Sequence, residues 1–250
     1  MMRKTVFILA LLLSVFTVKA AAQFEGKITY TFYETNDNGD RQDEDAFTAF
    51  ITPQRILLQG EDAFDVGSLF MTDGLLIRLD KKDFVFFTDK NKAMSISKSG
   101  ITSFINMFSD IHSKQNDTDE IEKDFTFTQT NETKTIGSYN ATKFIFQSKE
   151  DDDKAAIWMT RDIDINWGML AEPWGDSVAF LTQKNLPSGL ILQEGWLPLQ
   201  GTFYKDGETE GEFSAQVEPK DIKKEKVHLA PDVTVTSLSE YLFQHMRDQQ

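Results

Sequence analysis

The sequence has 250 residues with 26 basic and 40 acidic side chains, which give a formal net charge of −14. This length suffices for one large or two small domains, and the acidic excess disfavours nucleic acid and anionic lipid surfaces as partners, because like charges repel. The chain has no cysteine, which excludes disulfides, thiolate metal sites, cysteine nucleophiles and lipoprotein acylation.

Residues 1–22 have the three parts of a secretory signal peptide. Basic residues open the segment, residues 6–16 are apolar, and Ala20 and Ala22 form an Ala-x-Ala site. The apolar run is shorter than the ~18 residues that a spanning helix needs. We therefore predict cleavage after Ala22 and a mature domain of residues 23–250 without a transmembrane segment, exported to the periplasm or beyond the cell. The alternative is an uncleaved N-terminal anchor.

Loss of the signal peptide would make the protein more acidic. The segment holds three basic residues and no acidic one, so the mature net charge is −17. The mature chain is also rich in Phe, Ile and Thr and poor in Pro, a composition typical of a folded protein.

Most of the mature chain alternates apolar and polar residues with a period of two, which is typical of half-buried β-strands. Residues 75–79 and 84–87 flank a polar turn and predict a β-hairpin. The strands predicted from this pattern are 24–32, 46–51, 55–59, 75–79, 84–87, 93–97, 125–136, 142–146, 155–160, 190–197, 202–204, 212–219 and 227–235. Short strands with regular turns predict an antiparallel sheet or an open barrel.

Three stretches break the strand pattern. Residues 99–111 place apolar side chains on one helix face, with Ser99 at the N-cap position. Ser237 and Glu240 have capping-box spacing ahead of a C-terminal helix. Residues 165–184 are interrupted by proline and glycine and are predicted to be helical or irregular. No linker or internal repeat divides the chain, which favours a single domain.

Residues 34–45 half-resemble a calcium-binding loop. Glycine occupies the sixth place, and oxygen-bearing side chains occupy the first, third, fifth and twelfth. A calcium loop has Asp first and Glu last, because its last ligand is bidentate, whereas here Glu34 comes first and Asp45 last. The sequence therefore favours an acidic hairpin turn and predicts no metal site.

No catalytic or cofactor motif occurs in the sequence. His112, His228 and His245 lie on separate elements without the spacing of a zinc site or a catalytic dyad. A Gly-x-Ser-x-Gly elbow, a His-Glu-x-x-His pair and a phosphate-binding glycine loop are all missing. We therefore predict no catalytic residue and no cofactor, although the many carboxylates leave a hydrolase open as an alternative.

All four tryptophans fall within residues 158–196, around the irregular segment. Aromatic side chains gathered in this way line a ligand pocket or a lid, or they form the main core, and both interpretations stay open. Together with the helix predicted after Ser99, they supply the candidate ligand-binding residues Phe104, Phe108, Trp158, Trp167, Trp174 and Trp196.

Five short stretches, in this order, resemble the DUF4412 family of exported bacterial proteins, which is common in Bacteroidota. They are Phe24–Tyr30, Asp83–Phe86, Lys134–Lys143, Ile157–Ile163 and Leu186–Gly189. The resemblance implies a fold like the lipoprotein-carrier half barrel, a curved antiparallel sheet with helices over its concave face. It implies no known activity and no site residues. Relatives often have a cysteine near Ala141, which this chain lacks.

We therefore predict an α+β domain with a strongly curved antiparallel sheet, an open half barrel with a few helices over its concave face. The leading functional hypothesis is a non-enzymatic binding module for a lipid or another apolar ligand. The alternatives are a structural or interaction module of the cell envelope without a small ligand, and a carboxylate-dependent hydrolase. The predicted partner is an apolar small molecule or another envelope protein, and not nucleic acid.

Overall fold

The structure is a computed structural model, and it describes residues 23–35, 41–60, 64–65, 71–101, 125–149, 151–172 and 189–248. The signal peptide and most of the helix predicted after Ser99 lie outside these ranges.

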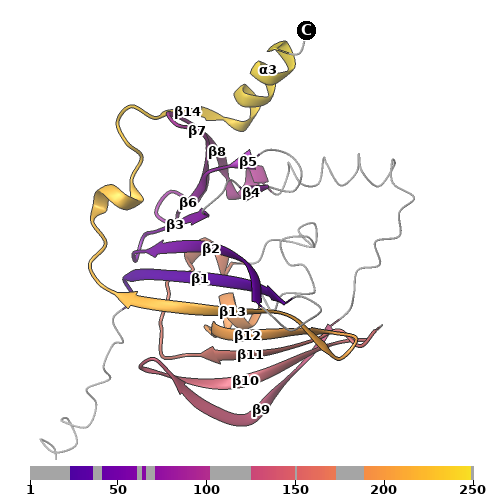
Figure 1. The fold of residues 1–250 in the computed structure, drawn as a ribbon. Coiled ribbons are helices and arrows are strands. Elements are labelled where there is room, and N and C mark those ends of the chain that lie inside the picture. Colours follow the sequence, from indigo (N-terminus) through magenta and orange to yellow (C-terminus); the bar gives the residue numbers. More distant parts are fainter. Residues whose placement is uncertain are drawn as a thin grey trace, which may run out of the picture.

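Strands make up most of the described chain (Figure 1). They are β1 (Gly26–Thr35), β2 (Arg41–Ile51), β3 (Arg55–Gly60), β4 (Phe64–Asp65), β5 (Met71–Thr72), β6 (Gly74–Arg78), β7 (Asp83–Asp89), β8 (Lys92–Ser97), β9 (Phe125–Ile136), β10 (Tyr139–Ser148), β11 (Lys154–Thr160), β12 (Leu197–Lys205), β13 (Glu208–Pro219) and β14 (Thr234–Ser237). The helical elements are η1 (Gly168–Leu170), η2 (Gly189–Gln193), η3 (Lys224–Val227) and α3 (Leu238–Asp248).

Twelve strands form one sheet in the order β14-β8-β7-β6-β3-β2-β1-β13-β12-β11-β10-β9. Neighbouring strands are antiparallel except β14, which pairs in parallel with β8. Strands β4 and β5 form a separate two-stranded sheet. The two edge strands of the large sheet, β14 and β9, do not pair with each other, so the sheet is open.

The two faces of this sheet differ in what they bury. We call the face that carries Ile28, Tyr30 and Phe32 the inner face, and the face that carries Thr29 the outer face, because side chains alternate along a strand. One buried cluster, most of it on the inner face, includes residues of β1, β2, β3, β6, β7, β8, β10, β12 and β13. A single core shared by so many strands requires the sheet to curve around it. This confirms the predicted α+β fold with an open, strongly curved antiparallel sheet.

Residues 161–172, which follow β11 and include η1, form a crossing segment over the inner face. Three of its side chains, Ile163, Ile165 and Met169, are buried in the inner core. It is joined to three distant parts of the chain by hydrogen bonds from Phe24 N to Asp164 O (2.6 Å), from Asn166 Nδ2 to Pro53 O (2.6 Å) and from Lys98 Nζ to Met169 O (3.0 Å). The crossing segment therefore closes the end of the inner face where β1 begins and β2 ends.

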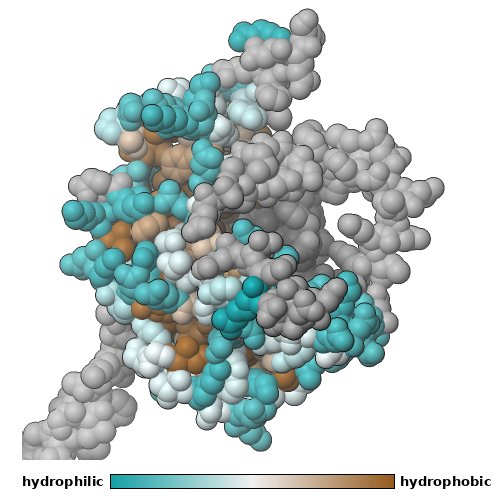
Figure 2. Space-filling view, in the orientation of Figure 1, coloured by the Kyte–Doolittle hydropathy of each residue, from teal (hydrophilic) through white to brown (hydrophobic). Residues whose placement is uncertain are grey.

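A second apolar cluster lies on the outer face of β3, β6, β7 and β8. It is covered by the segment that leads from β13 to β14, whose Ile222 and Val227 are buried there. Elsewhere on the face seen in Figure 2, apolar residues form separate patches among hydrophilic ones. Among the described residues, the outer face thus has one local core, which lies at the β3–β8 end of the sheet.

Two predicted strands are wrong in part. Residues 190–197 were expected to be extended, but Gly189–Gln193 forms the π-helical turn η2, and β12 begins at Leu197. Residues 227–235 were also expected to be extended, but β14 begins only at Thr234. The alternating apolar side chains of residues 227–233 cover the outer-face cluster, and this segment does not pair with the sheet.

Both helix starts near the sheet edge use a serine cap. The Ser237 hydroxyl accepts a hydrogen bond from the Glu240 N–H (3.3 Å), which agrees with the predicted cap of α3. Residues 98–101 are helical, and the cap there is Ser97 rather than Ser99, because the Ser97 hydroxyl accepts the Gly100 N–H (3.0 Å).

Candidate apolar binding face

A row of aromatic side chains crosses the inner face at the end of the sheet away from the crossing segment. We define the aromatic row as Tyr30, Phe32, Phe47, Phe127, Phe144, Phe146, Phe203 and Phe213. Every strand from β2 to β9 in the sheet order contributes to it except β11, which places Ala155 and Ile157 in the gap. Ring centroids within the row lie 4.9 to 6.5 Å apart, in the range of stabilising aromatic pairs.

Strand register brings these rings together from distant parts of the sequence. Phe32 of β1 lies opposite Phe213 of β13, and Tyr30 lies opposite Phe47 of β2. At the far end of the row, Phe127 of β9 lies opposite Phe146 of β10. Residues opposite each other on paired strands point to the same face, so each pair adds to one continuous surface.

Gly201 of β12 makes room for the ring of Phe213. It lies opposite Phe213 in the register, and a Cβ added at Gly201 would lie 2.2 Å from the Cε1 atom of that ring. Any larger side chain at this position would therefore displace the ring from the row.

The row is buried at its base and open along part of its length. Tyr30, Phe144, Phe146 and Phe213 are buried in the core, whereas Phe32, Phe47 and Phe203 are half-buried. Phe127 is 53% exposed, and it ends the row on the edge strand β9. The half-buried rings and Phe127 offer apolar surface that a ligand could remove from water.

Polar chemistry is sparse along the row. The Tyr30 hydroxyl donates to the Pro198 carbonyl (3.1 Å), and burial raises the pKa of this phenol far above its usual value. Asp45 lies opposite Phe32 in the register and is exposed. Apart from the Tyr30 phenol, the row consists of phenylalanine rings, so what it offers a ligand is mainly apolar contact.

The three described tryptophans do not share one pocket. The Trp158 ring lies 4.2 Å from Lys134 Nζ and 5.8 Å from Lys143 Nζ, on the outer face. Trp167 belongs to the crossing segment and packs against the inner core. Trp196 is buried and meets Phe144 edge-on, with 4.9 Å between the ring centroids. Of the candidate residues, therefore, Trp196 contacts the aromatic row, while Phe104, Phe108 and Trp174 lie outside the described residues.

Lys134, whose ammonium group lies beside Trp158, is partly removed from water. Burial, with a smaller contribution from the charge of Lys143, lowers the pKa of Lys134. Lys134 Nζ donates to Gln200 Oε1 (2.6 Å), and Lys143 pairs with Glu132 (3.1 Å). Each of the two ammonium groups therefore has a polar partner, and the cluster of Trp158, Lys134 and Lys143 stabilises the outer surface.

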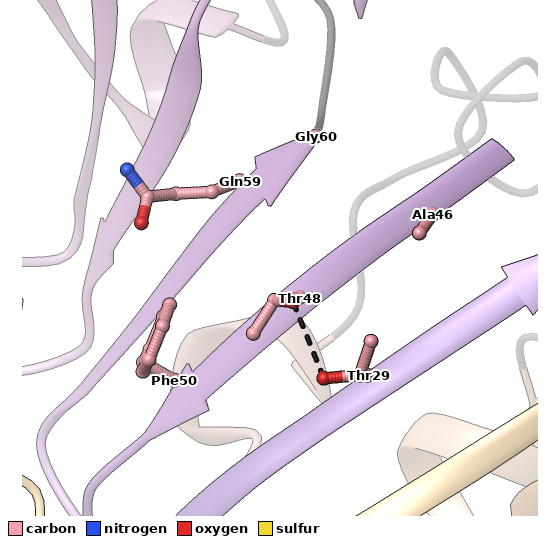
Figure 3. Close-up of a pocket in the computed structure, with 6 residues that line it drawn as sticks. All are labelled: Thr29, Ala46, Thr48, Phe50, Gln59 and Gly60. Atoms are coloured by element: carbon pink, nitrogen blue, oxygen red, sulfur yellow. Dashed lines mark hydrogen bonds between the residues drawn. The ribbon is translucent and has the colours of Figure 1, made fainter.

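An open depression of about 290 Å³ lies on the outer face of β1, β2 and β3 (Figure 3). Its lining residues are Thr29, Ala46, Thr48, Phe50, Gln59 and Gly60. The hydroxyls of Thr29 and Thr48 lie 3.3 Å apart, and Lys226 Nζ at its border donates to Gln59 (2.8 Å). No carboxylate or imidazole belongs to this lining, so the depression provides no acid–base pair.

Within the described ranges, no group of three or more His, Cys, Asp or Glu side chains is placed to hold a metal ion. Glu34 and Asp45, the ends of the calcium-like loop, are strand residues of β1 and β2, and residues 36–40 between them lie outside those ranges. Of the helices that the structure describes, none combines the length and apolar character needed to cross a membrane.

No family model and no curated protein matches this sequence. Among solved structures, the chain is similar to PNGF-II at 14% identity and a TM-score of 0.40, over 86% of this chain and 32% of that one. It is similar to MucB, solved in complex with MucA, at 9% identity and a TM-score of 0.39, over 88% and 59% of the two chains. A LolA-superfamily protein from Nitrosomonas europaea matches at 8% identity and a TM-score of 0.26, over 83% and 91%.

The chain spans about a third of the length of PNGF-II, since the match covers 32% of that protein. Identities and TM-scores at this level assign no activity to the chain.

Proposed function

We propose that this protein binds an apolar ligand, such as the acyl chain of a lipid, on the aromatic row of its inner face. The observation that carries the proposal is the run of neighbouring rings from Phe47 through Phe32 and Phe213 to Phe203, most of them half-buried. Beyond β11, Phe127 adds a ring that is 53% exposed. The crossing segment fills the other end of the inner face, and Leu190 and Trp196 pack on Phe144 and Phe146. Among the described residues, the open part of the row is therefore at Phe32, Phe47 and Phe203, with Phe127 at the far edge.

Energetics set a minimum size for the ligand. Burying one methylene group stabilises a complex by about 0.8 kcal/mol, and association itself costs at least about 4 kcal/mol. A chain of roughly fifteen carbons therefore supplies enough apolar surface for micromolar binding, which corresponds to about −8 kcal/mol. Strands lie about 4.8 Å apart, so a straight acyl chain of this length lies across several strands of the row.

The binding test uses a fluorescent fatty acid titrated into the purified mature protein. We expect micromolar affinity for the wild type and at least a tenfold loss for Phe203→Ala, because its half-buried ring contributes to the open part of the row. Thr202→Ala is the matched control, since Thr202 is the adjacent residue on the opposite face. Failure of the wild type to bind, or equal binding by Phe203→Ala, would show that the row is not a ligand site.

We also propose that the protein is an exported envelope protein of the DUF4412 family. In support, three of the resembling stretches coincide with strands of the sheet: residues 24–30 lead into β1, residues 83–86 lie in β7, and residues 134–143 span the β9–β10 hairpin. N-terminal sequencing of protein from its host should begin at Gln23 or within a few residues of it. Cytosolic protein that retains Met1 would contradict export.

A further inference from the structure

The edge strand β9 has an unused pairing edge. It is the last strand in the sheet order, and within the described residues only β10 pairs with it. An edge strand exposes a row of backbone N–H and C=O groups that can pair with another chain. Proteins usually protect such an edge with charges, bulges or proline.

Only the second half of β9 carries this protection. Residues 130–132 stand opposite the single residue Lys143 in a bulge. The first charged residues of the strand are Glu132 in this bulge and Lys134 after it. The first half, residues 125–129, is uncharged and alternates Phe and Thr up to Gln129. This half is rich in strand-forming residues and, within the described chain, carries none of these protections.

We propose that a second copy of this chain pairs with β9 in antiparallel orientation, with Phe127 of one copy opposite Phe127 of the other. In this register Thr126 of each copy lies opposite Thr128 of the second copy, so the inner faces and the outer faces of the two sheets coincide. The segment is complementary to itself because it has no charge to repel its copy. Pairing also covers Phe127, which is 53% exposed in the single chain and would then stack against its equivalent.

The dimer would extend the aromatic row through both chains. Phe127 already contacts Phe146 at 5.9 Å, and the second copy's Phe127 would continue the row on the same face. The second copy thus contributes a residue to the apolar face. The inference does not rest on ligand binding, because it follows from the edge and from the exposed ring.

Sedimentation of the mature protein over a range of concentrations tests the dimer. We expect a monomer–dimer equilibrium for the wild type and at least a tenfold higher dissociation constant for Thr128→Lys, because an edge lysine opposes pairing with a second edge. Thr135→Lys is the matched control, since it places the same charge on the same strand beyond the bulge and should leave the equilibrium unchanged. A wild type that stays monomeric, or a dimer that Thr128→Lys leaves intact, overturns the proposal.

Cross-linking tests the register without relying on affinity. The chain has no cysteine, so Phe127→Cys and Gln129→Cys each introduce a single thiol. Two thiols at position 127 of paired copies lie within disulfide reach, whereas thiols at position 129 are displaced by four residues, or about 13 Å. We expect rapid disulfide dimers from Phe127→Cys and slow ones from Gln129→Cys. Equal rates would indicate random collision and would contradict the proposed pairing.

Discussion

The ring of Phe213 lies directly over Gly201 on the neighbouring strand. A Cβ at Gly201 would lie 2.2 Å from Phe213 Cε1, a separation that non-bonded carbon atoms do not tolerate. The missing side chain of Gly201 thus leaves the space that the Phe213 ring occupies against β12. Since Phe213 contacts Phe32 on one side and Phe203 on the other, this one ring joins the rings of β1 to the ring of β12.

Gly201→Ala should damage both stability and binding. The added methyl group must displace the Phe213 ring, and such overpacking typically costs about 1–3 kcal/mol of unfolding free energy. Urea unfolding should show this loss, and the fluorescent fatty acid should bind more weakly. Thr202→Ala, on the outer face of the same strand, should change both quantities little. A Gly201→Ala protein as stable as the wild type would show that the ring has room to move.

Ile28→Ala should mainly lower stability, whereas Phe32→Ala should mainly weaken probe binding. Ile28 is 1% exposed in the core, so Ile28→Ala should lower the unfolding free energy by about 2–5 kcal/mol and leave the folded protein able to bind the probe. Phe32 is half-buried on the row, so Phe32→Ala should cost about 1–2 kcal/mol but weaken probe binding at least tenfold. Parallel urea unfolding and probe titration measure both. Loss of binding in Ile28→Ala alone would place the site in the core.

The phenol of Tyr30 should make the protein sensitive to alkali. Burial raises its pKa in the folded state, so the resulting stability is present below the unfolded value of about 10 and is lost as pH rises above it. Tyr30→Phe should cost about 1 kcal/mol near neutral pH, because the hydrogen bond to Pro198 is lost. It should then lose less stability than the wild type between neutral pH and pH values above about 10. Parallel stability curves for both proteins would refute this assignment.

Local sequence patterns predicted much of the sheet. The period of two located β1 and β10, because each alternates between buried and more open side chains. The polar turn located the β6–β7 hairpin, whose two strands are buried on both faces. The period of two was misleading before β14, at Val227 to Val233. There the apolar residues alternate because they cover the outer-face cluster, and a covering segment and a paired strand share one period.

The candidate site was harder to predict than the fold. The tryptophans are close in sequence, yet β11, the crossing segment and the turn before β12 carry Trp158, Trp167 and Trp196 to three different surroundings. The aromatic row was missed because most of its strands supply one ring each, and the pairing of β1 with β13 is a long-range contact. The available signal was an aromatic residue at alternate positions in several predicted strands, such as Phe127 in its Phe-Thr repeat.

Native mass spectrometry of the protein purified from its own host tests the central claim most directly. If the aromatic row holds an apolar ligand, the wild type should carry a discrete adduct that organic solvent extracts, and Phe203→Ala should carry less of it. The extracted wild type should then recover the adduct mass when the ligand is returned. A wild-type spectrum that shows only the mass of the polypeptide, from protein that also fails to bind the fluorescent fatty acid, would contradict a binding function for the row.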